Sequence, residues 1–133
     1  MIHIDRWQDG LRFVVLDGPM SLCAYVGIPA THPLAGHGYD NLPVDAHGGL
    51  TYAGGLPNEL ARDDGLYWYG WDYGHAGDFL RMPDGVRNLP GIHGKEWTPE
   101  LVDKDSWSAL YDMKRLMSLA EEIARRAQNG ASA

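Results

Sequence analysis

Two clusters of histidine and aspartate lie near the middle of the chain, and side chains of these types bind metal ions and transfer protons. The first cluster is Asp45-x-His47, and the second is Asp72-x-x-His75-x-x-Asp78. Mixed imidazole and carboxylate ligands suit Zn²⁺, Mn²⁺ or Fe²⁺, whereas Ca²⁺ and Mg²⁺ prefer all-oxygen sites. The clusters therefore predict a divalent-metal site with His47, Asp72, His75 and Asp78 as ligands.

A metal site of this kind predicts hydrolytic chemistry. A metal-bound water can lose a proton near neutral pH, and a neighbouring side chain can act as general base. We expect the catalytic residues to be Asp45, His47, His75 and Asp78, with Asp45 or Asp78 as the base. Three alternatives stay open: a metal-free acid–base dyad, a non-catalytic polar pocket, and residues that only cap turns and hydrogen-bond loops.

Other residues near these clusters are candidates for holding a ligand. Two glycines follow the first cluster and allow a close approach of the backbone, and two tryptophans offer planar faces for stacking, although most of the aromatic rings are expected in the core. A loop histidine could lean over the site, and an arginine after the second cluster could hold an anion. The predicted ligand-binding residues are Gly48, Gly49, Trp68, Trp71, His32 and Arg81.

Several enzyme signatures are absent from the sequence. The chain has no H-E-x-x-H zinc motif, no phosphate-binding G-x-x-x-x-G-K-[ST] loop and no G-x-S-x-G nucleophile motif. Its single cysteine, Cys23, excludes an intrachain disulfide and a cysteine-based zinc cage. The absence of these motifs means that no known catalytic signature identifies a reaction for this chain.

The composition is that of one ordinary domain. The 133 residues are 44% hydrophobic and 22% charged, which predicts a single domain spanning residues 1–133.

The formal net charge of −7 argues against binding to a nucleic acid duplex, which needs clustered cations. No stretch is long and apolar enough for a membrane helix, so a cytoplasmic protein without a membrane partner is expected.

Strands are expected to carry the two clusters. Apolar alternation over residues 44–53 predicts a strand with Asp45 and His47 on its polar face and a bulge at Gly48-Gly49. Residues 66–73 have aromatic side chains at both parities, which predicts a central strand covered on both faces. The second cluster would then lie on a turn at the end of that strand.

The remaining elements complete an α+β fold. The run R-F-V-V-L and residues 21–28 predict a hairpin, and Thr98-Pro99 resembles a helix start. A longer helix is expected from near Ser106 to Gly130, with Trp97 and Trp107 packing its start against the sheet. We predict a mainly antiparallel sheet with long ordered loops and one long C-terminal helix packed on it.

The strings H-G-G-L-T and G-W-D-x-x-H-x-G-D are the most specific part of a resemblance that spans about residues 23–78. Here the chain resembles a group of small proteins from phages, prophages and their bacterial hosts, for which no activity is established. The resemblance implies a phage-type origin and draws attention to the two His/Asp clusters. Three functions follow as expectations: hydrolysis of a nucleotide or other phosphoester, sequestration of a small nucleotide-like ligand, or inhibition of a host protein.

Overall fold

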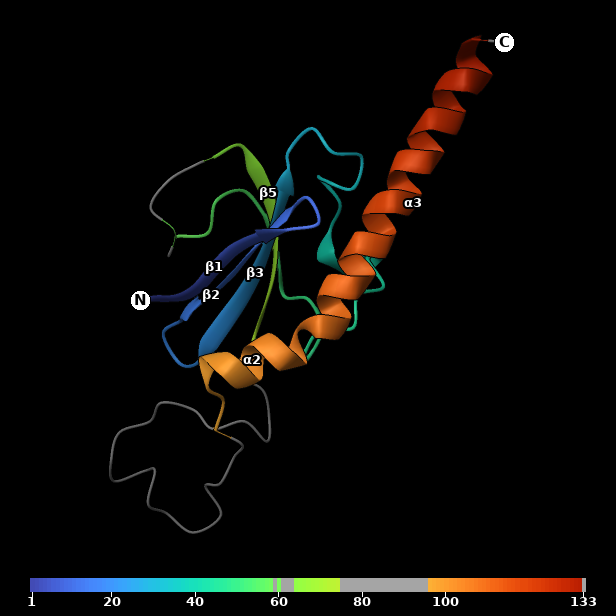
Figure 1. Ribbon diagram of the computed structural model, residues 1–133. Coiled ribbons are helices and arrows are strands. Elements are labelled where there is room, and N and C mark those ends of the chain that lie inside the picture. The colour runs from blue at the N-terminus through green and yellow to red at the C-terminus, as the bar shows by residue number, and fades with distance from the viewer. Residues whose placement is uncertain (59, 61–63, 75–95, 133) are drawn as a thin grey trace, which may run out of the picture.

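The computed structural model describes residues 1–58, 60, 64–74 and 96–132 of the chain. The described residues form five strands: β1 (Ile2–Gln8), β2 (Leu11–Asp17), β3 (Leu22–Pro29), β4 (Tyr52–Gly54) and β5 (Leu66–Asp72). They also form a 3₁₀ turn, η1 (Tyr39–Asn41), and the helices α2 (Pro99–Asp105) and α3 (Trp107–Ser132). Figure 1 shows α3 running across the sheet and continuing past it. The predicted α+β class is confirmed.

The strands form one antiparallel sheet in the order β1-β2-β3-β5-β4. The predicted hairpin is β2 and β3, in which Phe13 lies opposite Val26. Strand β1, which sequence analysis did not predict, extends this hairpin at the outer edge. It reaches β2 through a two-residue turn in which Asp9 and Gly10 both have positive φ, the conformation that suits a tight hairpin.

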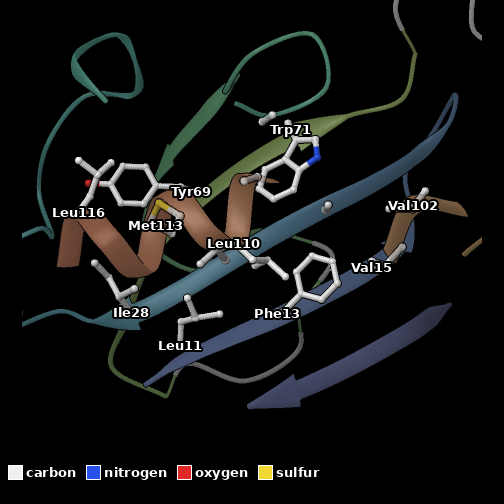
Figure 2. Packing of buried hydrophobic residues seen from close by; sticks show 14 of the residues in the cluster. Leu11, Phe13, Val15, Ile28, Tyr69, Trp71, Val102, Leu110, Met113 and Leu116 are labelled. Carbon is white, nitrogen blue, oxygen red and sulfur yellow. The ribbon is translucent and has the colours of Figure 1, made fainter. Parts of the chain in front are cut away.

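The sheet is covered on both faces, as the aromatic pattern of β5 predicts. Tyr69 and Trp71 lie on the helix side, and Figure 2 shows them with Phe13 and Met113 in the larger core cluster. Trp68 lies on the other side, in a smaller cluster that includes residues of β2 and the segment after β4. Alternation along β5 therefore divides its rings between two cores.

The helical region begins where the sequence predicts. The Thr98 side chain accepts a hydrogen bond from the Leu101 amide at 3.2 Å, and Pro99 occupies the first turn of α2. Two expectations are wrong. Helix α3 continues through Gly130 to Ser132, and the Trp107 side chain is 68% exposed instead of packing against the sheet. Trp97 does pack against the larger core cluster.

Only the first half of α3 packs closely on the sheet. Met113 is fully buried and Met117 is nearly so, but no described residue after Met117 is buried. The second half extends beyond the sheet in Figure 1. Among the described helices, none is both long and apolar enough to cross a membrane.

The strand predicted over residues 44–53 is wrong. Pairing is limited to β4, and the residues before it form a loop with a turn at Gly48 and Gly49. The Ala46 amide donates to Val44 and the Gly49 amide donates to Ala46, so these backbone groups bond locally instead of to a neighbouring strand. Val44, Ala46 and Leu50 still pack on the larger core cluster, but they do so from a loop without strand pairing.

Candidate functional site

The imidazole of His47 lies in an aromatic corner at the end of β5. It stacks on Tyr73 with ring centroids 4.6 Å apart and an interplanar angle of 13°. Trp97 meets it edge-on, with centroids 5.0 Å apart. His47 keeps 23% of its side-chain exposure, so the ring is held in place and still reaches solvent. We call His47, Tyr73, Trp97, Asp105 and Ser106 the His47 cluster.

A carboxylate from α2 completes this corner. Asp105 Oδ2 accepts a hydrogen bond from the Tyr73 hydroxyl at 2.9 Å and lies 4.0 Å from His47 Nδ1. The Tyr73 oxygen in turn accepts from Trp71 Nε1 at 3.1 Å and lies 3.2 Å from Ser106 Oγ. One carboxylate oxygen is therefore oriented by a buried hydroxyl and faces the imidazole.

The protonation state of Tyr73 supports this arrangement. Burial raises the pKa of Tyr73 well above its ordinary value; the contacts with Ser106 and Trp71 oppose this shift, and Asp105 adds to it. The hydroxyl therefore keeps its proton at neutral pH and donates to Asp105. A hydrogen bond to an ionised acceptor is stronger than one between neutral groups, so Tyr73 holds the carboxylate firmly.

Helix α3 fixes the loop that carries His47. The Asp45 amide donates to Asp112 Oδ2 at 2.9 Å, and Ser108 Oγ donates to the Asp45 carbonyl at 3.1 Å. Ala46 is buried between these contacts and His47. The turn after His47 contains Gly48 and Gly49, whose φ values of 68° and 83° favour glycine. The loop therefore has two backbone anchors just before the imidazole.

The predicted catalytic and metal-binding residues are only partly brought together. Asp45 is exposed, and its backbone is what makes the two described contacts with α3. Asp72 lies on the face of β5 opposite Tyr73, and its Oδ1 accepts from the Gly74 amide at 3.0 Å. His75 and Asp78 lie outside the described residues. Within the described ranges, no three His, Cys, Asp or Glu side chains are grouped to hold a metal ion.

The predicted ligand-binding residues have mixed positions. Trp68 is fully buried and Trp71 is 2% exposed, so both indoles are core residues instead of accessible stacking surfaces. His32 accepts from the Leu34 amide through Nδ1 and faces Glu121 Oε1 at 3.0 Å through Nε2, which attaches its loop to α3. Arg81 lies outside the described residues.

The partner of His47 was missed by sequence analysis. Asp105 ends a short helix in the charged segment D-K-D, which reads as a solvated helix end. No fixed spacing relates it to His47, so the pairing could not be found without the fold. The concentration of aromatic residues at 67–73 was the only sequence feature that drew attention to Tyr73.

Comparison of the chain with protein-family models, with curated proteins and with solved structures finds no match.

Proposed function

We propose that the protein is a small hydrolase that acts on a nucleotide or another phosphoester, with His47 as its acid–base residue. The observation that carries the proposal is the contact between His47 and the Asp105 carboxylate, which Tyr73 orients. An imidazole that is held in place, partly exposed and next to a carboxylate is a common general base. Trp97 adds a planar surface beside it.

In this mechanism, His47 removes a proton from a water molecule as the water oxygen attacks phosphorus. The bond to the leaving oxygen breaks, and the imidazolium returns the proton to that oxygen. Asp105 faces Nδ1 and stabilises the imidazolium that forms between these steps. Tyr73 holds Asp105 in position, so we assign it a positioning role.

A divalent metal at this site would need ligands beyond the described residues, among which no three His, Cys, Asp or Glu side chains are grouped. His47 and Asp105 supply one nitrogen and one oxygen donor, which suits Zn²⁺, Mn²⁺ or Fe²⁺. His75 and Asp78 remain the proposed source of further ligands. A bound metal would supply positive charge for a phosphoester in a protein with a net charge of −7. Elemental analysis of untagged protein purified without chelator measures this directly.

The proposal is tested by assaying nucleotides and nitrophenyl phosphoesters with the wild-type protein, with and without added metal ions. We expect turnover that falls by at least about 100-fold in His47→Gln, in line with the usual contribution of a general base. His37→Gln is the matched control, because His37 Nε2 contacts only the Pro33 carbonyl, at 3.2 Å, among the described groups. Equal turnover in His47→Gln and the wild type would refute the proposal.

A second candidate is a protein that binds a small nucleotide-like ligand without converting it. The partly exposed indole of Trp97, which packs against the buried Tyr73 ring with centroids 4.6 Å apart, favours it. This candidate predicts thermal stabilisation by a nucleotide that is recovered chemically intact. Recovery of a hydrolysed product would instead support the proposed hydrolase.

A further inference from the structure

Strand β1 is an edge strand of the sheet formed by the described residues. Within the described part of the chain, β2 is the only strand that pairs with it. The seven residues Ile2–Gln8 therefore direct alternate backbone N–H and C=O groups outward. An unpaired row of this kind is a template for another extended chain.

Large apolar side chains are exposed on both sides of this edge. Trp7, on the face of the smaller core cluster, is 59% exposed. On the helix face, Trp107 and Tyr111 are each 68% exposed. Trp107 and Tyr111 line a groove of about 450 Å³ between β1 and α3. Its other lining residues are Arg6, Gln8, Asp9, Leu110 and Lys114. Exposed aromatic rings around a groove mark an interaction surface.

The charges on β1 do not protect its edge. Charged side chains usually discourage edge-to-edge pairing. Here Asp5 accepts two hydrogen bonds from Arg12, at 2.8 and 2.7 Å, and Arg6 donates to Asp103 at 2.8 Å. Because each charge is compensated within the same molecule, a second strand could approach without leaving a charge unpaired.

We propose that this edge is a dimer interface, at which β1 pairs antiparallel with β1 of a second copy. A two-fold axis through the edge lets the same surface serve both copies. The pairing satisfies the outward backbone groups of both strands and covers the aromatic rings on both faces of the joined sheet. This interface uses no residue of the His47 cluster and does not depend on the proposed hydrolase activity.

The apolar area is sufficient for such a dimer. An aromatic side chain can bury about 150–250 Å², so the exposed parts of Trp7, Trp107 and Tyr111 offer roughly 400 Å² per copy. Two copies then contribute roughly 800 Å² from these rings, and Ile2, the groove and the strand backbones add to this toward the ~1,000 Å² that a specific interface should exceed. A small foreign peptide would leave part of this surface uncovered.

Sedimentation velocity of the full chain, from low micromolar to the highest soluble concentration, tests the proposal. We expect the sedimenting mass to double with concentration. In the double variant Trp107→Ser/Tyr111→Ser the mass should stay that of a monomer, and the circular dichroism should be unchanged because both side chains are exposed. Tyr39→Ser is the matched control, since Tyr39 is an exposed aromatic residue in η1, outside β1 and the groove.

A wild-type protein that remains monomeric at every concentration would overturn the proposal and leave the edge to a different partner. A dimer that survives in both the double variant and Trp7→Ser would also overturn it, because the contact would then lie elsewhere. Loss of the dimer in the Tyr39→Ser control would show that the effect is not specific to this surface and would count against it.

Discussion

The His47 imidazole lies nearly parallel to the Tyr73 ring, with centroids 4.6 Å apart. This stacking joins a loop histidine to the residue that follows β5, and it brings Nδ1 to 4.0 Å from the Asp105 carboxylate that Tyr73 also contacts. Tyr73 thus supports the imidazole with its ring and orients the carboxylate with its hydroxyl.

Replacing Tyr73 with Phe keeps the ring and removes the hydroxyl. The buried Trp71 Nε1 then loses its acceptor and Asp105 loses a donor. We expect the free energy of unfolding to fall by about 2 kcal/mol, the usual cost of an unpaired buried group. Urea unfolding measures this loss. Tyr111→Phe, at an exposed position, should change the stability by less than about 0.5 kcal/mol.

Two buried tyrosines predict a loss of stability at alkaline pH. Burial raises the pKa of Tyr69 to about 12 and raises that of Tyr73 further. A raised folded-state pKa favours the protonated form, so this stability is fully present below the unfolded value near 10 and is lost as the pH rises from there through the folded value of about 12 for Tyr69. Thermal melts above that pH should show a smaller decline in Tyr69→Phe than in wild type. An identical decline in both proteins would contradict the assignment.

The ion pair on β1 predicts a loss of stability in acid. The hydrogen bond from Arg12 lowers the pKa of Asp5, which desolvation opposes. A lowered folded-state pKa gives stability that is present above the unfolded value and is lost as the pH falls below about 4. Asp5→Asn should cost about 1 kcal/mol or less at neutral pH, since the pair is partly exposed. The difference should disappear in acid; a difference that persists there would contradict the account.

The turn after His47 requires glycine for its backbone conformation. Gly49 has a φ of 83°, and no atom lies within 4 Å of a Cβ added there. Gly49→Ala should therefore destabilise the protein by about 1 kcal/mol through backbone strain alone. Gly55→Ala is the matched control, because Gly55 also has open space around it but no positive φ. Equal stability of the two variants would show that the turn is not constrained.

Sequence patterns predicted the elements whose contacts are regular and local. The alternation of Trp68 and Tyr69 in β5 reflects two real cores, and the apolar stripe of α3 through Met113 reflects its packing on the sheet. The predicted end of α3 at Gly130 was wrong. Gly130 has open space around it and is tolerated within the exposed last turns of the helix. Strand β1 was missed because none of its residues is buried, so its apolar pattern is weak.

Of the candidate site, the sequence pointed only to His47 and its neighbours. The spacing of Asp45 and His47 suggested that both side chains share one face of a strand, but the segment is a loop held by Asp112 and Ser108. The carboxylate that faces His47 belongs to Asp105, on a helix far along the chain. Such a contact depends on tertiary packing, so it cannot be inferred from the spacing of residues along the chain.

A double-mutant cycle on turnover tests the central claim, that His47 and Asp105 act as one acid–base pair. Phosphoester hydrolysis is measured for wild type, His47→Gln, Asp105→Asn and the double variant, with Asp103→Asn as the control from the same helix. We predict that both single variants lose turnover and that the double variant is no slower than His47→Gln, because residues that act as a unit are non-additive. Full turnover in Asp105→Asn, or losses that multiply in the double variant, would contradict the pairing.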